Sequence, residues 1–497
     1  MKRNSAELAD KLFDLAIIGG GILGAGIARD AALRGLSVAL VEKGDFASGT
    51  SSRSTKLVHG GLRYLEQLSL GLVAESCRER SILLEMAPHL VTPLSFLLPA
   101  YSGDPRSLAM LRLGTTLYDW LTPRRHAATP RHRSLSADEA VAAEPSLPSE
   151  HLRGAVLFYD CQMDDARLCL ETVLDARRRG AACANYCQVT GFRQTWDRVD
   201  ALQVVDHVTG NVFDVRAKCF VNATGPWIEQ VGRFSSRNPP PVSLSPTKGV
   251  HLVIPRINRQ HGIYFQSKRD RRMIFLLPWG DDSLLGTTDT RFAQPADAVR
   301  TEMDDVDYLL EQLRELAPSR AIDAAEIITS FAGVRALIRS EHRRPSRRSR
   351  EERIVVSGEN LLTVAGGKYT TFRAISDKVV GRVSRMLGQR LAGCVTAATP
   401  LTKRRPEKTG IRLSDSPDVY ESDIVFAFTD EMAVTLEDVM RRRTRLALSG
   451  RGREEVATQV SHLVAGQMNW NEEARTEQLH LYLQYWERSR PWHQSRL

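Results

Sequence analysis

The sequence predicts an α/β protein in which a dinucleotide-binding unit comes first, a β-rich region follows and helices end the chain. Three observations support this prediction: a glycine-rich turn between two apolar runs near the N-terminus, strand-like stretches between residues 240 and 300, and helical periodicity after residue 400. With 497 residues, the chain is long enough for two or three domains and a large buried core.

The N-terminal unit consists of a strand, a glycine turn, a helix and a second strand that ends in an acidic residue. Apolar runs at 15–18 and 38–41 flank a helical stretch at 27–33, and the spacing G-x-G-x-x-G opens the helix. Such a turn lets backbone approach a pyrophosphate, and the helix N-terminus offers N–H groups to it. A terminal carboxylate can accept from both ribose hydroxyls. The unit does not distinguish FAD from NAD, and its predicted nucleotide contacts are Gly19, Gly20, Gly21, Ile22, Leu23, Gly24 and Glu42.

The composition is that of a globular protein with a basic balance. Hydrophobic residues make up 42% and charged residues 26%, with a net charge of +9. No apolar run reaches the roughly 18 residues of a membrane span, and no signal-peptide region precedes the first strand, so we expect a cytosolic chain. The seven cysteines form no C-x-x-C pair, which predicts free thiols and no metal site.

The positive charge is clustered and suits an anionic partner such as a lipid surface, a substrate or a nucleic acid. Seven arginines lie between residues 339 and 353, and four lie between 441 and 445. The alternative interpretation is that both clusters are solvated helix faces and loops.

A polar stretch at 47–55 follows the βαβ unit and can bring N–H and hydroxyl donors to phosphate or flavin oxygens. Two adjacent glycines at 60 and 61 then imply backbone pressed against a flat group, for which a flavin ring is the natural candidate. The predicted cofactor contacts in this part are Lys43, Thr50, Ser51, Ser52, Lys56, Leu57, His59, Gly60 and Gly61.

The middle of the chain alternates between predicted helices and strands. We expect a helix after residue 67, a strand near 94–98, a helix at 108–121 and exposed loop at 122–150. The 108–121 helix is apolar enough for either the core or a membrane surface, and we favour the core. A strand at 154–159 precedes a helix capped by Asp164 or Asp165.

Strands at 185–220 lead to a second turn that can face the dinucleotide, with contacts predicted at Ala223, Gly225 and Trp227. Residues 240–300 predict an antiparallel sheet that could cover a substrate, followed by a helix at 303–316 and a strand ending near Arg335. The strand at 361–365 is predicted to end in a glycine turn that opens a long helix and offers N–H groups to an anion. Its predicted contacts are Gly366, Gly367, Lys368, Tyr369 and Thr370. Helices at 429–448, 453–468 and 471–488 then form a separate C-terminal domain.

Nine segments in order along the chain carry a family resemblance. They are 17–66 (IIGGGILGAG to GGLRYLE), DDARL at 164–168, NATGPW at 222–227, PTKGVHLVIPR at 246–256, TTDT at 287–290, GVRALI at 333–338, SREE at 349–352, GGKYTTFR at 366–373 and EMAVTLEDVMRRRTR at 431–445. Together they resemble the FAD-dependent, quinone-linked glycerol-3-phosphate dehydrogenase family. This chain differs in Arg291-Phe292 after TTDT, in Tyr369 where Trp is usual, and in SREE for an S-R-D-H pattern.

The resemblance implies the glycine-oxidase-type flavoprotein architecture: a Rossmann-like FAD domain, an antiparallel β cap and a C-terminal helical domain. The implied boundaries are 11–66, 151–235 and 354–392 for the FAD domain, 67–150 and 236–353 for the cap, and 400–497 for the helical domain. The implied reaction is oxidation of sn-glycerol 3-phosphate to dihydroxyacetone phosphate in glycerol catabolism, with electrons passed to ubiquinone. The protein would attach peripherally to the cytoplasmic face of the inner membrane, through its anionic lipids.

The chemistry of this reaction indicates site residues within the matched motifs. A phosphate dianion is best bound by guanidinium and ammonium groups, which Arg63, Arg335 and Lys368 supply beside glycine turns. Tyr64 can add a hydroxyl. Hydride transfer to flavin N5 needs a base for the hydroxyl proton. The candidates for the base are, in order, His251 and His59; Arg350 is open between a substrate and a lipid-surface role.

Rival interpretations remain at this stage. One is a glycerol-3-phosphate oxidase that uses oxygen, or a related FAD-dependent oxidase of another small substrate. A pyridine-nucleotide enzyme is disfavoured by the single complete G-x-G-x-x-G, and nucleic-acid binding is disfavoured because the arginine clusters contain no aromatic residues. The sequence leaves a homodimer open.

Overall fold

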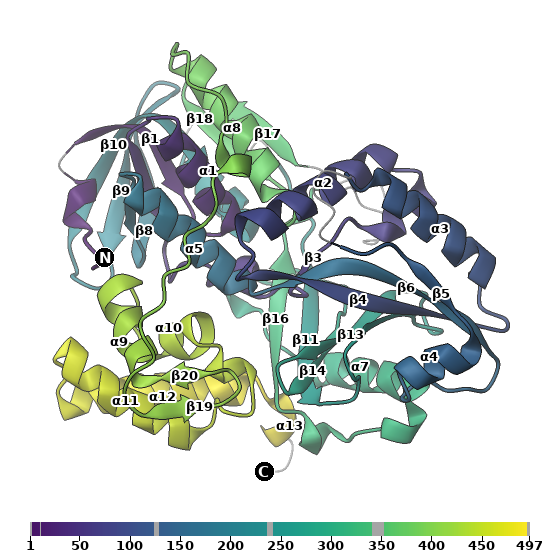
Figure 1. Ribbon diagram of the computed structural model, residues 1–497. Helices are drawn as coiled ribbons and strands as arrows, with labels where there is room; N and C mark the ends of the chain where they lie inside the picture. The colour runs from purple at the N-terminus through teal and green to yellow at the C-terminus, as the bar shows by residue number, and fades with distance from the viewer. Residues whose placement is uncertain (1, 10, 124–128, 236–241, 340–351, 495–497) are drawn as a thin grey trace.

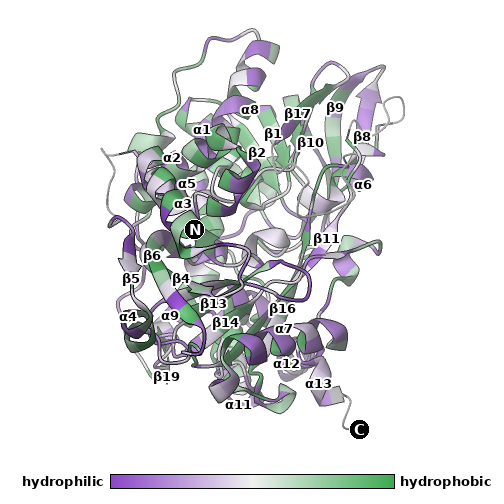
Figure 2. Cartoon of the chain, turned by 90° about the vertical axis from the view of Figure 1, so that its right-hand side faces the viewer, coloured by the Kyte–Doolittle hydropathy of each residue, from purple (hydrophilic) through white to green (hydrophobic). Residues whose placement is uncertain are grey.

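The computed structural model describes residues 2–9, 11–123, 129–235, 242–339 and 352–494. Two large sheets lie next to each other, and in the view of Figure 1 the C-terminal helices lie below the first sheet and beside the lower part of the second. Figure 2, turned by 90°, shows the strands of the first sheet mostly in the hydrophobic colour, as expected for strands covered on both faces.

The first sheet is largely parallel and contains the glycine-rich unit. Its strand order is β17-β18-β10-β1-β2-β7, and the β8–β9 hairpin joins it at β10. Strand β1 runs parallel to both its neighbours, β10 and β2. The strands are β1 (Leu12–Ile18), β2 (Val38–Val41), β7 (Ala182–Ala184), β8 (Cys187–Thr195), β9 (Arg198–Asp206), β10 (Val212–Asn222), β17 (Arg353–Ser357) and β18 (Leu361–Ala365).

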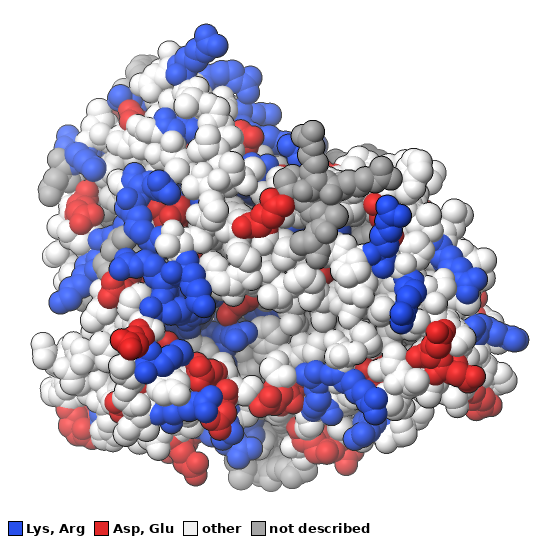
Figure 3. Space-filling model, in the orientation of Figure 1, with Lys and Arg blue, Asp and Glu red and all other residues white. Residues whose placement is uncertain are grey.

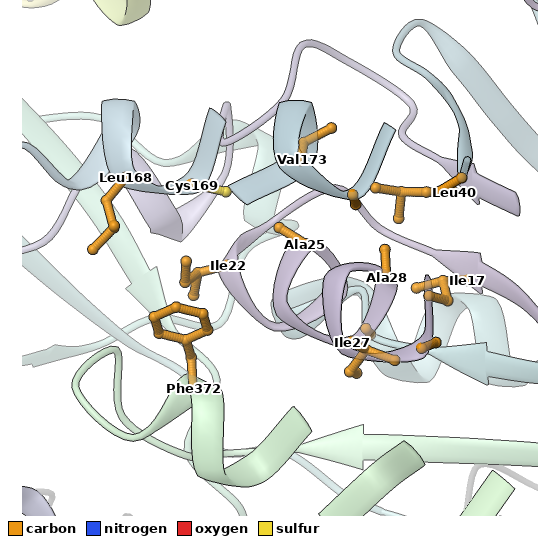
Figure 4. Packing of buried hydrophobic residues seen from close by; sticks show 14 of the residues in the cluster. Ile17, Ile22, Ala25, Ile27, Ala28, Leu40, Leu168, Cys169, Val173 and Phe372 are labelled. Carbon is orange, nitrogen blue, oxygen red and sulfur yellow. The ribbon is translucent and has the colours of Figure 1, made fainter. Parts of the chain in front are cut away.

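Helix α1 (Ile22–Leu33) packs between the other helices of this half, α5 (Asp165–Arg178) and α8 (Phe372–Met386). Ile22 and Ala25 face apolar side chains of α5 and Phe372 of α8 (Figure 4). Gly26 permits this contact, because a Cβ there would lie 2.7 Å from the Phe372 ring. Burial of each large apolar side chain contributes about 1.5–3 kcal/mol, so the core holds the N-terminus of α1 at the end of β1.

The second sheet is antiparallel except where β12 runs parallel to β4. Its order is β15-β11-β14-β13-β12-β4-β6-β3, with β16 paired to β11 and β5 to β6. It therefore combines the strands expected between residues 240 and 300 with strands from earlier in the chain, among them β4 at the strand expected near 94–98. The strands are β3 (Leu57–Val58), β4 (Val91–Tyr101), β5 (Arg133–Leu135), β6 (Leu152–Met163), β11 (Thr247–Pro255), β12 (Gly262–Gln266), β13 (Met273–Trp279), β14 (Asp282–Gly286), β15 (Thr290–Arg291) and β16 (Thr329–Arg335).

Helix α3 (Leu108–Leu121) is not the core helix that we favoured. Leu113 is 72% exposed and Trp120 is 82% exposed, and the buried residues of the helix are Thr115 and Tyr118. The prediction was wrong because apolar periodicity shows that a helix has an apolar face, without showing whether another element covers it.

Two further expectations need correction. The 122–150 segment is not simply loop, because it contains β5 and helix α4 (Ala137–Ala143), which the Ser136–Glu139 capping box begins. Helix α8 begins at Phe372 rather than at the Gly366–Gly367 turn, so the predicted N–H groups at those glycines do not belong to its first turn. The other helices of the two sheet regions are α2 (Leu70–Met86), α6 (Ile228–Gly232) and α7 (Met303–Leu316).

The C-terminal region is helical, with a small β19–β20 hairpin (Arg412–Ser414 and Val419–Tyr420) before the helices. Its helices are α9 (Glu421–Asp430), α10 (Leu436–Asp438), α11 (Glu454–Met468), α12 (Glu472–Arg488) and α13 (Pro491–Gln494). The single helix expected at 429–448 is instead broken into α9, α10, a π-helical turn at 439–443 and a 3₁₀ turn at 446–448. Asn471 accepts a hydrogen bond from the Ala474 N–H and so caps α12, as predicted.

The π-helical turn buries most of the second arginine cluster against the first sheet. Asp45, next to the glycine-rich unit, accepts from Arg442 Nε at 2.6 Å and from Arg443 Nη1 at 2.7 Å. Arg441 stacks on Tyr485 with 4.0 Å between its guanidinium carbon and the ring centroid. Arg441, Arg442 and Arg443 are therefore neither a solvated face nor a surface for an anion, because their charges are neutralised inside the protein. Arg445, the fourth arginine of the cluster, is 39% exposed and pairs with Asp164.

The C-terminal helices also contact the second sheet. Ser489 accepts a hydrogen bond from Ser330 of β16 through its carbonyl oxygen at 2.5 Å, and Trp279 of β13 donates to the Leu448 carbonyl oxygen at 3.1 Å. On the face shown in Figure 3, Lys and Arg side chains gather most densely on the left, between the first sheet and these helices.

Replacing Asp45 with Asn should weaken the attachment of the C-terminal helices to the first sheet. Burial alone would raise the pKa of Asp45, but Arg443 and Arg442 more than offset burial and hold it well below 3.8. In the variant, Arg442 keeps its ion pair with Asp438, but Arg443 loses its carboxylate partner and retains the Glu431 carbonyl oxygen. We therefore expect the free energy of unfolding to fall by about 3 kcal/mol or more in urea titrations at neutral pH.

The exposed Asp415, which pairs with Arg412 and is 72% exposed, provides the control. Its change to Asn should alter stability by less than about 0.5 kcal/mol. The Asp45 contribution is present at neutral pH, above the ordinary value of 3.8, and is lost as the pH falls through the lowered folded pKa. Equal effects of the two substitutions would contradict this role for Asp45.

Candidate functional site

A cavity of about 630 Å³ lies between the two sheets. Its walls come from the ends of β1 and β2, the polar 47–55 stretch, the 59–63 segment, strands of the second sheet and the 366–370 turn. The size is that of a typical cofactor or ligand site. The three glycine turns that the sequence analysis placed at the site, near residues 19–21, 59–61 and 366–367, therefore meet at one cavity.

The first turn leaves room for a phosphate group. Gly19 has a φ of +105°, and a Cβ at Gly24 would lie 1.8 Å from the Gly19 carbonyl oxygen. Only glycine permits this approach, which places the N-terminus of α1 at the cavity wall. Ser51 accepts from the Ile22 N–H at 2.9 Å and so ties the polar stretch to the same turn.

Glu42 lies at the end of β2 as predicted, and backbone N–H groups fix its carboxylate by hydrogen bonds. Its carboxylate accepts from the Gly20 N–H at 2.7 Å and from the Gly44 N–H at 2.9 Å. Burial raises the pKa of Glu42, against the effect of these two donors. Each carboxylate oxygen has a second lone pair with which it can accept from a ribose hydroxyl.

Most predicted cofactor contacts line this cavity, and a few do not. Those that line it are Gly19, Gly21, Ile22, Leu23, Glu42, Lys43, Thr50, Ser51, Leu57, His59, Gly61, Ala223, Gly225, Trp227, Gly366, Gly367, Lys368, Tyr369 and Thr370. Gly20, Gly24, Ser52, Lys56 and Gly60 lie behind the wall. Lys56, for example, is buried in an ion pair with Asp165 at 2.5 Å.

The second and third turns are linked to each other. The His59 N–H donates to Thr370 Oγ1 at 3.2 Å. Gly60 packs on the far side, where a Cβ would lie 2.3 Å from Cys77 Sγ, and its N–H donates to the buried Asp160 at 3.2 Å. Gly61 has a φ of +83° and Gly367 a φ of +85°. The backbone of both turns is thus held close to the cavity, where a flat ring can lie against it.

Cationic side chains collect beside these turns. Lys368 Nζ lies 4.1 Å from the centroid of the Tyr64 ring and donates to Ser76 Oγ at 3.2 Å. Arg63 Nη2 donates to the Tyr64 hydroxyl at 3.0 Å. Arg63 and Lys368 line the cavity, whereas Tyr64 is 3% exposed and lies beneath them. Tyr64 therefore positions the two cations by cation–π and hydrogen-bond contacts.

Arg335 reaches the cavity from the end of β16 and is held by the TTDT segment. Its Nη1 lies 2.9 Å from Asp289 Oδ1, and its Nη2 donates to Thr287 Oγ1 at 2.9 Å. Gly249 allows the guanidinium to lie against β11, because a Cβ there would be 2.4 Å from Nη2. A planar guanidinium fixed in this way has one orientation at the cavity wall, where Asp289 and the Thr288 carbonyl oxygen also accept from it.

His251 is buried in the cavity wall on β11. Its Nε2 lies 3.0 Å from Thr55 Oγ1, and its ring stacks on Phe331 with 4.9 Å between centroids. Burial lowers the pKa of His251 well below 6.5, and nearby Arg335 and Lys56 lower it further. The imidazole is therefore neutral at pH 7, and the same lowered pKa makes it a weaker base than an exposed histidine.

Arg350 and most of the first arginine cluster lie outside the described residues. The sequence analysis missed Thr55, Thr287 and Asp297, which line the cavity, and Asp289, which holds Arg335. It also missed an aromatic wall made by Phe96, Phe158, Tyr264 and Phe275. The TTDT pattern could have indicated two of these positions, but alternating aromatic residues in strands are typical of any sheet core.

One cluster outside the cavity has potential metal ligands: single ligand atoms of Asp30, Asp377 and Cys394 lie within 4.8 Å of one another. Arg34 Nη2 lies 2.7 Å from Asp30 Oδ2 and 2.5 Å from Asp377 Oδ1. The guanidinium already compensates the two carboxylates, so the cluster needs no ion for charge balance.

Comparison with known proteins agrees with the geometry. Residues 14–373 match the FAD-dependent oxidoreductase (DAO) family, and residues 352–475 match the C-terminal domain of alpha-glycerophosphate oxidase. The aerobic glycerol-3-phosphate dehydrogenase of Staphylococcus saprophyticus is 40% identical over 388 residues, which are 77% of this chain and 68% of that protein.

Solved structures show the same architecture. The glycerol-3-phosphate dehydrogenase of Bacillus halodurans, complexed with FAD, has a TM-score of 0.77 and 28% identity, covering 98% of this chain and 97% of that one. Glycine oxidase from Geobacillus kaustophilus has a TM-score of 0.57 and 23% identity over 79% of this chain and 99% of its own, and so shows a shared fold. The chain belongs to the FAD-dependent oxidoreductases and, among them, to the family of the aerobic glycerol-3-phosphate dehydrogenases.

Proposed function

We propose that this protein oxidises sn-glycerol 3-phosphate to dihydroxyacetone phosphate with FAD and passes the electrons to membrane ubiquinone. One observation carries the proposal: a single cavity joins the dinucleotide turn to Arg63, Arg335, Lys368 and the neutral His251. A doubly charged phosphate ester with an oxidisable hydroxyl matches these groups, and the 40% identical relative bears the corresponding name.

The residues of the cavity have separable roles in this reaction. Arg63 and Lys368 bind the phosphate from the side of the glycine turns, and Arg335 binds it from β16. The substrate C2 hydroxyl loses its proton to His251, and Thr55 fixes the orientation of the imidazole. When bound, FAD would supply the oxidising chemistry as the acceptor of the C2 hydride. The aromatic wall excludes water from the remaining space.

Several residues of the cavity lining would hold the cofactor. Backbone around Gly19, Gly21 and the α1 N-terminus would bind the pyrophosphate, and Glu42 would bind the ribose. The Gly61, Gly366 and Gly367 backbone would lie against the ring. His59 lines the cavity as well and is the second candidate for the base.

The proposed contact with the membrane is supported by an exposed apolar surface rather than by the second arginine cluster, which is mostly buried. This apolar α3 surface consists of Met110, Leu113, Leu117 and Trp120, with Leu68 and Leu70 on the neighbouring segment. Figure 2 views the molecule from the side on which α3 lies. In the described part of the chain, no helix has the length and apolar composition needed to cross a bilayer, so the proposed attachment is peripheral.

Anaerobic addition of glycerol 3-phosphate to the FAD-loaded protein should bleach the flavin absorbance, whereas glycerol should not, because it lacks the phosphate that the cations bind. The reduced protein, mixed with a ubiquinone analogue, should then regain its colour much faster than when mixed with air. Slow reoxidation by the quinone together with rapid peroxide formation in air would favour an oxidase. Absence of bleaching by glycerol 3-phosphate would refute the proposed substrate.

Replacing Arg335 with Ala should raise the KM for glycerol 3-phosphate by about 100-fold, the loss expected for a charge-assisted contact of about 2–3 kcal/mol. Flavin content should stay the same. Arg335→Lys should recover part of the affinity, because it keeps the charge but loses the planar fork. Steady-state kinetics and absorbance spectra provide the measurements, and an unchanged KM in the Ala variant would remove Arg335 from the phosphate site.

Replacing Leu113 and Trp120 together with Ser should lower the affinity for vesicles containing anionic lipids by at least about tenfold, because each large apolar side chain contributes about 1.5–3 kcal/mol on burial. Co-sedimentation at low and high salt measures the bound fraction. Leu481→Ser, at a leucine that is 50% exposed on α12, is the matched control and should bind like the unmodified protein. Equal vesicle binding by the double variant, Leu481→Ser and the unmodified protein would exclude the apolar α3 surface as the membrane contact.

A further inference from the structure

We propose that Lys43, Trp227 and Asp297 form a clasp that closes the nucleotide end of the cavity and sets the rates at which FAD enters and leaves. The three residues line the cavity but come from distant parts of the chain. Lys43 follows β2, Trp227 ends the short η5 turn (Gly225–Trp227), and Asp297 lies in η6 (Ala296–Ala298), which follows β15 of the second sheet.

Asp297 joins the other two residues through its two carboxylate oxygens. Its Oδ1 accepts from Lys43 Nζ at 2.7 Å, and its Oδ2 accepts from Trp227 Nε1 at 2.9 Å. Lys43 Nζ also lies 4.1 Å from the centroid of the Trp227 ring, within the range of a cation–π contact. Each member therefore contacts both of the others, and the three side chains form a closed triangle.

The position of the triangle indicates what it controls. Lys43 directly follows Glu42, the residue placed to bind the adenosine ribose. Trp227 packs against the polar stretch on the other side, because a Cβ at Gly49 would lie 3.1 Å from its ring. Asp297 belongs to the second sheet region, so the triangle bridges the two sheet regions beside the nucleotide end of the cavity. A dinucleotide that passes this end must separate Asp297 from the other two.

The exposure of the Lys43 and Asp297 side chains is consistent with a clasp that opens and closes reversibly. The Lys43 side chain is 37% exposed and that of Asp297 is 61% exposed, so solvent partly screens the ion pair and the clasp can open without unfolding its surroundings. Because the three side chains bind one another, the free energy needed to open the clasp is the same when FAD enters as when FAD leaves.

Asp297→Ala should therefore raise both the association and the dissociation rate constants of FAD by about tenfold, the factor expected when one ion pair and one hydrogen bond are lost. The equilibrium Kd should stay nearly unchanged. Flavin fluorescence reports release from the holoprotein after dilution, and stopped-flow quenching reports rebinding to the full-length deflavinated chain.

Glu311→Ala is the matched control. It removes an ion pair with Arg269 that has the same 2.7 Å distance and has side chains 60% and 44% exposed, away from the cavity. Both FAD rate constants should stay at the value of the unmodified protein. High salt should speed release from the unmodified protein and leave Asp297→Ala little changed, because the screened pair is already absent there.

Three results would overturn the clasp: unchanged FAD rates in Asp297→Ala, an equal increase in Glu311→Ala, or a rise in dissociation alone with a weaker Kd. The last result would make Asp297 a direct cofactor contact instead of a gate. Anaerobic bleaching of FAD-loaded Asp297→Ala by glycerol 3-phosphate should match that of the unmodified protein. The clasp does not depend on the identity of the substrate, so its failure is distinguishable from failure of the proposed function.

Discussion

The contact between Gly24 and the Gly19 carbonyl is the constraint on which the site depends. A side chain at Gly24 would overlap that oxygen at 1.8 Å, so the first turn of α1 reaches the end of β1 only because both positions are glycine. The same approach lets α5 and α8 pack on the other faces of α1. The glycine turn at the cavity and the core of the first sheet therefore depend on the same backbone contact, and a change in one would alter the other.

The positive charge of the chain serves two different purposes. Arg29, Arg167 and Arg443 are buried in ion pairs with Asp175, Glu431 and Asp45, where they join segments distant in sequence. Arg63 and Lys368 instead lie at the cavity wall against the Tyr64 ring. An aromatic face orients a cation without neutralising it, so these charges can attract an anionic substrate.

The C-terminal helices connect the two halves of the site. They contact the first sheet through Asp45, close to the nucleotide end of the cavity, and the second sheet through Ser330 and Trp279. Since the cavity lies between the two sheets, these contacts help to set the distance between its walls.

The sequence by itself determined the glycine turn, Glu42, the cap Asn471 and most of the strands, because these depend on spacing and on neighbours within a few residues. It left the cap of α5 open between Asp164 and Asp165, and the structure shows that Asp164 is the cap. Only the tertiary structure decided that α3 presents its apolar face to solvent, and that Arg442 meets Asp45 across 397 positions of the chain. It also decided that Thr55 orients His251 and that Asp297 meets Trp227. Whether a charge or an apolar face is buried depends on which distant element packs against it, and local sequence patterns do not contain that information.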